Sequence, residues 1–482
     1  MAACAPSSGP GAPAPPGATG ARLGSAIEAI IDPPPLDGTH WGILVRDRSG
    51  RTVYARQAGR HFIPASNTKL VVTAVALGTL GPGYRYMTPI YGHDVRADSL
   101  AGRLVVVGTG DPTISGRFHE SGLAPLDSIA AAIAATGLRA VGELVVDASR
   151  FDDDRVNGTW EVGDLPSPTA APIGAFAIGE GTFQVERTPG TAPGVPATVR
   201  ALPTDSLQPI VTRAVTDTAG ARPVVRVDLL DRRDTLFLEA RVPFGAAPDT
   251  FRLAVTDPDV YATRALARAL RAHGVRIGAV RVVRDTLEAR ARAAAPHVQL
   301  AALESPPMTE IVAAILQPSQ NWMAEQLLKT LGAHAGEQGS WESGVAAERE
   351  YLIERAGIDS LAFFLRDGSG LSAQNLLTPE ATVRLLEHAR DAGWGEYYRA
   401  ALAAPGLRGS TLANRIEALE GRVFAKTGTI TNVNSLSGYL IADNGVELTF
   451  SIFTNGTGLR SAVVRPAIDA VVQAIARYGG TQ

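Results

Sequence analysis

The stretch PASNTKLVVTAVAL, residues 64–77, decides how the rest of the sequence is interpreted. Pro64 and Ala65 precede a mostly apolar run, so Ser66 is expected at the N-terminus of a helix. A spacing of three then places Lys69 on the same helical face, one turn after the serine. A neutral lysine within hydrogen-bond reach can take the proton of a serine hydroxyl, which is a poor nucleophile by itself. The stretch therefore predicts an activated serine, with helix N–H groups that face the oxyanion formed on attack.

Two further polar motifs support this interpretation. Ser319-Gln320-Asn321 lies at the start of another predicted helix and supplies a second hydroxyl and an amide. Lys426-Thr427-Gly428-Thr429 follows an extended run and is expected on a strand edge, where glycine lets another backbone approach closely. Its hydroxyls and ammonium suit a substrate carboxylate, and its last N–H is a candidate second oxyanion donor. Each motif alone is commonly a turn or a helix cap, but the three together indicate a catalytic site.

Lysine is rare in this chain, with three among 45 lysines and arginines. Arginine is a flat fork that stays protonated, so a retained lysine indicates a need for an amine that can lose its proton, or for a compact ammonium. Lys69 and Lys426 fit that description because both lie in the polar motifs. Lys329 lies in a predicted amphipathic helix and is expected to be a solvated surface charge.

Composition limits the classes of function. The 482 residues fit two or three domains, and 45% hydrophobic with 19% charged residues describes a globular chain. A net charge of −3 gives no electrostatic case for nucleic acid as a partner. The eight histidines include no H-E-x-x-H and no pair at ligand spacing, so neither a metal nor another cofactor is expected. G-x-S-x-G is absent, which disfavours an α/β-hydrolase. His61 lies near Ser66, but the lysine already provides a base, so a packing or surface role is expected for the histidine.

The single cysteine, Cys4, excludes an internal disulfide framework. Met1-Ala2-Ala3-Cys4 is similar to the end of a bacterial lipoprotein signal, although the apolar segment that should come before it is absent. Residues 1–21 are rich in proline, glycine and alanine and are expected to form a disordered tether. Two interpretations stay open: a lipidated cysteine that tethers the chain to a membrane, or a cysteine that happens to lie near this start.

The rest of the chain divides into three parts by its pattern. Residues 22–92 and 299–482 combine helical patterns with strands, and Asp443-Asn444-Gly445 is a strong hairpin signal in the second of these parts. Residues 93–298 between them contain a weak repeat, in which 137–146 resembles 274–283 and each copy follows an alanine-rich helical stretch. The two copies flank a strand-rich piece at about 200–246. This arrangement predicts an inserted domain with a further insertion inside it.

The three motifs are those of penicillin-binding proteins and class A β-lactamases. Within that superfamily the chain most closely resembles the D-alanyl-D-alanine carboxypeptidase/endopeptidase family, the class C low-molecular-mass penicillin-binding proteins, over about residues 22–480. The long insertion between Ser66 and Ser319 is typical of that family. The resemblance implies an α+β fold with a β-lactamase/transpeptidase-like catalytic domain, an antiparallel sheet flanked by helices, and a large inserted two-part domain. The stretches that carry it are Phe62 to Leu70, Gly108 to Thr113, Asp367 to Ser372 and Ala425 to Thr429.

The resemblance implies a serine-type D-Ala-D-Ala carboxypeptidase/endopeptidase that acts on peptidoglycan stem peptides and is acylated by β-lactam antibiotics. Its compartment would be periplasmic or otherwise extracytoplasmic, where peptidoglycan lies. By motif position, Ser66 would be the acylated nucleophile, Lys69 its base, and Ser319 the relay of a proton to the leaving D-alanine. Asn321 would hold the substrate amide, and Lys426 with Thr427, Gly428 and Thr429 would bind the substrate. Trp160 and Asp164 would line the pocket for its diamino-acid side chain.

Three departures from the family pattern bear on these expectations. Gln320 replaces the usual aspartate of the second motif, whose side chain is not part of the proton relay. Thr109 replaces a glycine in the pattern Gly-Gly-Gly-Asp-Pro. Thr169 stands where an aromatic residue is expected, which leaves the third residue of the substrate peptide open. Two alternatives remain: a β-lactamase or esterase on the same scaffold, or a non-catalytic wall-binding module, which the intact motifs disfavour.

Overall fold

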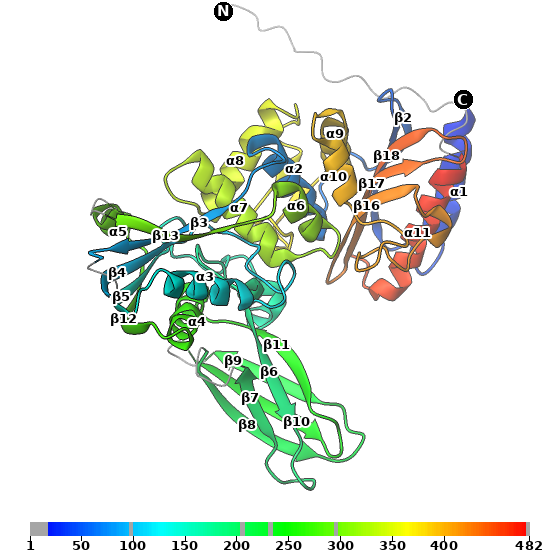
Figure 1. Ribbon diagram of the computed structural model, residues 1–482. Helices are drawn as coiled ribbons and strands as arrows, with labels where there is room; N and C mark the ends of the chain where they lie inside the picture. Colours follow the sequence, from blue (N-terminus) through cyan, green and yellow to red (C-terminus); the bar gives the residue numbers. More distant parts are fainter. Residues whose placement is uncertain (1–17, 96–99, 203–207, 230–234, 294–296, 479–482) are drawn as a thin grey trace, which may run out of the picture.

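The computed structural model describes residues 18–95, 100–202, 208–229, 235–293 and 297–478 (Figure 1). Cys4 and most of the predicted tether lie outside these ranges. The first helix, α1, spans Ala18–Ile31 and therefore begins inside the stretch predicted as tether. Within the described part of the chain, no helix is both long and apolar enough to cross a membrane.

The two ends of the chain close one antiparallel sheet, in the order β16-β17-β18-β1-β2. The predicted hairpin at residues 443–445 joins β17 to β18, and β18 pairs with β1 along its length. Helices α1 and α11 pack side by side on one face, where apolar residues of both helices meet those of the sheet (Figure 1). The bounds are β1 His40–Asp47, β2 Thr52–Arg56, β16 Val423–Ile430, β17 Val433–Ile441, β18 Glu447–Asn455 and α11 Ser461–Tyr478.

A helical layer covers the other face of this sheet, and α2, Lys69–Thr79, lies at its centre. Every residue from Lys69 to Leu77 is buried, as the mostly apolar sequence after the lysine predicts. Neighbouring helices surround α2, and the turn just before it packs against β16 and β17 of the sheet. These helices are α6 Met308–Leu316, α7 Asn321–Ala335, α8 Trp341–Glu354, α9 Pro379–Asp391 and α10 Gly395–Ala401. A short strand pair, β14 Phe363–Phe364 and β15 Leu376–Leu377, follows α8.

The inserted part is built on a second five-stranded sheet, in the order β12-β5-β4-β3-β13. The sequence repeat is confirmed as two helix–strand units, because α3 precedes β5, α4 precedes β12, and the two strands pair in parallel. A Cβ added to Gly278 would clash with the carbonyl oxygen of Gly142 on the paired strand, so glycine at position 278 permits close strand contact. The bounds are β3 Met87–His93, β4 Leu100–Val107, α3 Ala124–Ala135, β5 Ala140–Asp147, α4 Pro258–Ala272, β12 Arg276–Val283, α5 Thr286–Ala293 and β13 His297–Glu304.

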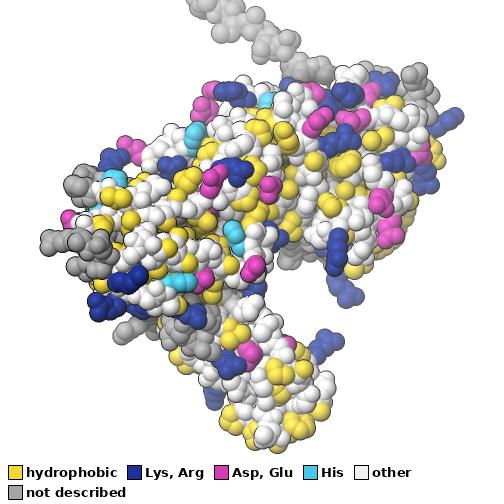
Figure 2. Space-filling model, in the orientation of Figure 1, with side chains coloured by type: hydrophobic (Ala, Val, Ile, Leu, Met, Phe, Trp, Pro, Cys, Tyr) yellow, Lys and Arg dark blue, Asp and Glu magenta, His cyan; other side chains and the backbone are white. Residues whose placement is uncertain are grey.

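The inserted part is wider than the predicted bounds of 93–298, because β3 and β13 both belong to its sheet. The inner insertion is also wider than 200–246. It contains two three-stranded sheets, β11-β6-β7 and β8-β10-β9, which project from the body of the molecule (Figures 1 and 2). The strands are β6 Thr182–Thr188, β7 Thr198–Leu202, β8 Ile210–Asp217, β9 Val224–Leu229, β10 Leu236–Pro243 and β11 Asp249–Ala254.

Candidate active site

Ser66 lies in η1, a 3-10 helix of residues Ala65–Thr68 that leads directly into α2. The turn is held against the sheet by Asn67, whose side-chain amide donates to the carbonyl of Lys426 (3.0 Å) and to the hydroxyl of Ser435 (2.7 Å). Ala65 has a φ of 48°, which is strained for a residue with a side chain. The serine is thus presented by a turn that both neighbouring strands and α2 fix in place.

Lys69 is buried and its Nζ has three hydrogen-bond partners. They are the Oγ of Ser66 (2.9 Å), the Oδ1 of Asn321 (2.7 Å) and the carbonyl oxygen of Ser369 (2.6 Å). Burial lowers the pKa of Lys69 to about 7, against the opposing effect of the acidic side chains of Asp367 and Glu325. A lysine with this pKa is neutral in a substantial fraction of molecules at neutral pH, so it can accept the proton of the serine.

Lys426 contacts the second serine. Its Nζ donates to the Oγ of Ser319 (2.8 Å) and to the carbonyl of Thr427 (2.8 Å), and it is also buried. Burial, followed by the nearby charge of Lys69, lowers the pKa of Lys426 well below its ordinary value. Ser319 has a φ of 65°, a conformation that is costly for serine and that the surrounding contacts must stabilise.

The strand β16 passes close to the serine turn because Gly428 has no side chain. A Cβ at this position would lie 2.8 Å from the carbonyl of Pro64 and 3.1 Å from the backbone nitrogen of Ser66. The predicted reason for the glycine, close backbone approach, is therefore confirmed. On either side of it, Thr427 Oγ1 hydrogen-bonds the hydroxyl of Thr411 (2.8 Å), whereas Thr429 is exposed.

A cleft of about 390 Å³ opens above these groups. Ser66, Ser319, Asn321 and Thr429 all line it, so the three motifs, although far apart in sequence, meet at one surface. Asn321 bridges the cleft, since its Oδ1 accepts from Lys69 and its Nδ2 donates to the carbonyl of Thr169 (3.0 Å).

The loop of residues 367–372 fixes Lys69 from behind. Asp367 accepts hydrogen bonds from the backbone N–H groups of Gly370 (2.8 Å) and Ser372 (2.7 Å). Glu325 on α7 accepts from the N–H of Ser369 (2.7 Å), and burial, followed by the charge of Asp367, raises its pKa to about 7. These two buried carboxyl groups hold the carbonyl of Ser369 at the lysine. Residues 367–372 were among the stretches that carry the family resemblance, but the sequence did not indicate that they position Lys69.

Trp160 is not among the residues that line the cleft, and its part in a side-chain pocket stays a prediction. Its side chain is buried, its Nε1 donates to Asp367 Oδ2 (2.9 Å), and its ring packs edge-on against Trp341. The tryptophan therefore supports the loop behind Lys69. Asp164 ends the short 3-10 helix Val162–Asp164, half-buried and close in sequence to Thr169, which lines the cleft. Its role in the side-chain pocket stays a prediction.

Lys329 is not a surface charge, because its side chain is buried. Its Nζ binds Asp152 Oδ1 (2.5 Å) and the carbonyl of Asp154, and lies 3.9 Å from the ring centre of Trp341. The helical pattern alone could not reveal which neighbours this face of α7 meets. His61 is exposed, and its Nε2 hydrogen-bonds the carbonyl of Leu361.

One group at the site was not found from the sequence. Gln320 donates from its Nε2 to Glu180 Oε2 (2.8 Å), and its Oε1 caps α7 by accepting from the N–H of Met323 (3.1 Å). Glu180 comes from the inserted part, where it lies in the short 3-10 helix Gly179–Gly181 just before β6, and it belongs to no sequence motif. Glutamine at position 320 fits this neighbour, because an aspartate would bring two carboxylates together.

The fold and the site are those of a serine-dependent acyl-transfer enzyme: a serine at a helix start, a buried lysine on its hydroxyl, and a second serine–lysine pair across the cleft. Residues 23–478 match the D-Ala-D-Ala carboxypeptidase 3 (S13) family. A D-alanyl-D-alanine carboxypeptidase of Actinomadura sp. (strain R39) is 35% identical, over 96% of this chain and 87% of the relative. The chain therefore belongs to the S13 family of D-Ala-D-Ala carboxypeptidases.

Other relatives agree with this assignment. The D-alanyl-D-alanine carboxypeptidase DacB of Haemophilus influenzae is 24% identical, over 87% of this chain and 86% of the relative. The crystal structure of penicillin binding protein 4 (dacB) from Haemophilus influenzae superposes with a TM-score of 0.81 at 20% identity, covering 94% of this chain and 99% of that chain. A complex of that protein with a β-lactam superposes with a TM-score of 0.74. The predicted α+β fold with a large insertion is thus confirmed.

Proposed function

We propose that this peptidase hydrolyses the D-Ala-D-Ala end of peptidoglycan stem peptides, and the related bond of cross-linked peptides, through an acyl-enzyme on Ser66. Membership of the S13 family supports the reaction class. The observation that supports the residue roles best is the set of partners around Lys69. A neutral lysine amine has two N–H donors and one lone pair, and Nζ meets two pure acceptors and one hydroxyl. The neutral form therefore satisfies all three contacts when Ser66 donates its proton to the amine.

In this mechanism the Oγ of Ser66 attacks the carbonyl carbon of the penultimate residue, and its proton moves to Nζ of Lys69. The negative charge on the substrate oxygen would be stabilised by the backbone N–H groups of Ser66 and Thr429. The approach of β16 to the serine turn at Gly428 supports this pairing of donors. Positioned proton transfer of this kind contributes roughly 10²- to 10⁴-fold in rate.

Lys426 and Ser319 would act on the leaving D-alanine. An ammonium has three N–H donors, and two of those on Lys426 are directed at Ser319 and the carbonyl of Thr427. The third would bind the terminal carboxylate of the substrate, with the hydroxyl of Thr427 beside it. Ser319 would relay a proton to the amine nitrogen as the peptide bond breaks: it gives up its hydroxyl proton and regains the one that Lys69 took from Ser66. A carboxylate in the cleft favours the charged form of Lys426, and that charge in turn keeps Lys69 neutral.

β-Lactam antibiotics would acylate the same serine, because they present an amide and a carboxylate in a comparable arrangement. Penicillin binding protein 4 of Haemophilus influenzae, which shares this fold, forms a complex with a β-lactam. A β-lactamase or esterase on the same scaffold differs in how quickly water reaches the acyl-enzyme. The substrate assigns the protein an extracytoplasmic location, and lipidation of Cys4 would tether it to a membrane there.

Mass spectrometry after incubation with a labelled penicillin tests this proposal. We expect a covalent adduct on the intact protein that maps to Ser66 and persists after excess penicillin is removed. Release of D-alanine from a D-Ala-D-Ala peptide is measured in parallel. An adduct on Ser319 would overturn the assignment of roles, and rapid loss of the label would favour the lactamase. A protein that binds wall fragments without forming an adduct would be the non-catalytic module.

A further inference from the structure

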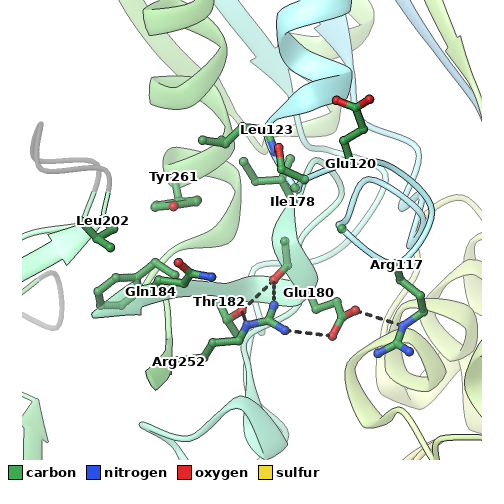
Figure 3. A pocket seen from close by; sticks show the side chains of 15 residues that line it. Arg117, Glu120, Leu123, Ile178, Glu180, Thr182, Gln184, Leu202, Arg252 and Tyr261 are labelled. Atoms are coloured by element: carbon green, nitrogen blue, oxygen red, sulfur yellow. Dashed lines mark hydrogen bonds and ion pairs between the residues drawn. The ribbon is translucent and has the colours of Figure 1, made fainter. Parts of the chain in front are cut away.

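A second cavity, of about 570 Å³, lies beside the active-site cleft. It is larger than the cleft and is formed where the inner insertion joins the rest of the inserted part (Figure 3). The loop before α3 forms one wall, Tyr261 of α4 another, and the strands β6 and β11 a third. The lining is mixed, with Leu123, Ile178 and Tyr261 as apolar members and Arg117, Glu180 and Arg252 as charged ones.

Arg117 joins the cavity to the cleft, because it lines both of them. Its Nε donates to Glu180 Oε1 (3.1 Å), and the other oxygen of Glu180 accepts from Gln320, which lines the cleft. The contacts thus lead from the cavity directly to the Ser319-Gln320-Asn321 motif. The cavity and the cleft are therefore neighbours that share Arg117 in their linings.

The backbone at this junction is strained. Gly179, Glu180 and Gly181 have φ values of 60°, 60° and 64°, so three successive residues adopt the left-handed conformation. The two glycines accept it freely, but the glutamate adopts it at a cost in free energy. Backbone strain that persists in a folded protein is concentrated at functional sites. Here the strain places the Glu180 carboxylate between the guanidinium groups of Arg117 and Arg252 (Figure 3).

The charge at this end of the cavity is positive. Two arginines face one glutamate, and both oxygens of Glu180 already have partners. Arg252 also donates to Thr182 Oγ1 (2.8 Å) and to the carbonyl of Gly179 (2.6 Å), which leaves it largely satisfied. By contrast, the terminal nitrogens of Arg117 make no hydrogen bond with any described residue. Glu120, the other acid on the lining, lies away from both arginines in Figure 3.

We propose that this cavity is an extended substrate subsite, in which Arg117 binds a carboxylate carried by the peptide upstream of the bond that is cleaved. The apolar wall of Leu123, Ile178 and Tyr261 would contact the aliphatic part of the same peptide. A guanidinium fixed through its Nε presents its terminal nitrogens in the planar fork that suits a carboxylate. The inference rests on the proposed function, since it treats the cavity as a continuation of the cleft that binds D-Ala-D-Ala.

Two synthetic peptides that end in D-Ala-D-Ala test the proposal. They differ only at an upstream residue, which carries a free carboxylate in one peptide and the corresponding primary amide in the other. The measurement is kcat/KM for release of D-alanine. For the unaltered protein we expect a preference of about tenfold for the acidic peptide, which is the contribution of one charge-assisted hydrogen bond. Arg117→Gln should abolish this preference.

Three further variants distinguish an effect on ligand binding in the cavity from a general effect of substitution on the protein. Arg252→Gln should reduce the same preference, and Gln184→Trp, at an exposed position on the cavity lining, should lower kcat/KM for both long peptides relative to acetyl-D-Ala-D-Ala. Arg213→Gln is the matched control, because it removes one positive charge from an exposed position on β8 and should keep the full preference.

The inference would be overturned by an unaltered protein that cleaves both long peptides equally well, or by a preference that survives in Arg117→Gln. A uniform loss of activity in Arg117→Gln on every substrate, with the preference intact in Arg252→Gln, would mean that Arg117 only positions Gln320 through Glu180. Failure of the unaltered protein to release D-alanine from any of these peptides would instead refute the proposed function.

Discussion

Replacing Lys69 with arginine should slow acylation of Ser66 by penicillin. Lys69 Nζ has three hydrogen-bond partners: two acceptors, Asn321 Oδ1 and the carbonyl of Ser369, and the hydroxyl of Ser66. Arginine keeps the positive charge that these acceptors favour. It cannot become neutral, and so it cannot take the serine proton.

The size of the effect follows from the pKa of Lys69. An ordinary lysine, with a pKa near 10.5, is neutral in roughly one molecule in 3,000 at pH 7. With the pKa lowered by burial to about 7, about half of the molecules are neutral at that pH. Burial thus increases the fraction of competent base by a factor on the order of 10³. Lys69→Arg removes that base, and we expect acylation to slow by about 10²- to 10⁴-fold.

The pH dependence gives a second measure of the same group. In the proposed mechanism Lys69 must be neutral to act, so the acylation rate of the unaltered protein should rise about tenfold per pH unit below pH 7 and level off above it. Stopped-flow measurement of the rate constant for penicillin acylation, between pH 5 and 9, provides this profile. Lys329→Arg is the control: it alters another buried lysine and is expected to lower the Tm, but the pH profile should stay where it is.

Two results would refute this reasoning. One is a flat profile between pH 5 and 8, which would mean that proton transfer to Lys69 does not limit acylation. The other is a Lys69→Arg protein that reacts within tenfold of the unaltered rate at pH 7. Either result would assign the base to another group and leave Lys69 as a positioning residue for Ser66.

Three further outcomes are expected. Lys426→Arg keeps the positive charge at the proposed carboxylate site but changes the shape of the group that carries it. Steady-state kinetics should therefore show a rise in KM for carboxylate-bearing peptides that is larger than the fall in kcat. Asp164→Asn should lower kcat/KM for a peptide with a side-chain ammonium by about five- to tenfold relative to the same peptide without it, since one partly exposed charge pair is lost; an unchanged ratio would mean that the side-chain pocket lies elsewhere. Gln320→Glu places a carboxylate beside Glu180 and should slow acylation about tenfold, whereas Glu180→Gln in the same chain should restore the rate in a double-mutant cycle.

Much of the site could be predicted because its chemistry depends on local spacing. The spacing of three positions from Ser66 to Lys69 places a hydroxyl and an amine together at the start of a helix, and Nζ lies 2.9 Å from Oγ as that spacing requires. Gly428 was predicted from the need for close approach, and the contact is with the serine turn itself. The hairpin at residues 443–445 and the two repeated helix–strand units were likewise visible in short patterns.

What the sequence could not provide were contacts between segments that share no pattern. Trp160 faces inward and bonds to Asp367, about 200 residues away, so no periodicity indicates its direction. β13 pairs with β3 across the whole insertion, and this pairing moves both domain boundaries outward. Glu180 lies between two glycines in a left-handed turn, and this turn brings its carboxylate to Gln320. The two glycines do not indicate in the sequence which residue the glutamate contacts.

The three lysines require a broader explanation than catalysis. All three are buried, and each donates to a backbone carbonyl: Lys69 to Ser369, Lys426 to Thr427 and Lys329 to Asp154. A guanidinium is wider than a lysine amine and spreads its donors over a plane, so it cannot replace that compact group at a small buried site. The few lysines of this chain are therefore buried amines. Only the neighbouring hydroxyls of Ser66 and Ser319 distinguish the two proposed catalytic lysines from the third. In arginine-rich chains a rare lysine thus predicts burial first, and chemistry only where a hydroxyl lies within reach.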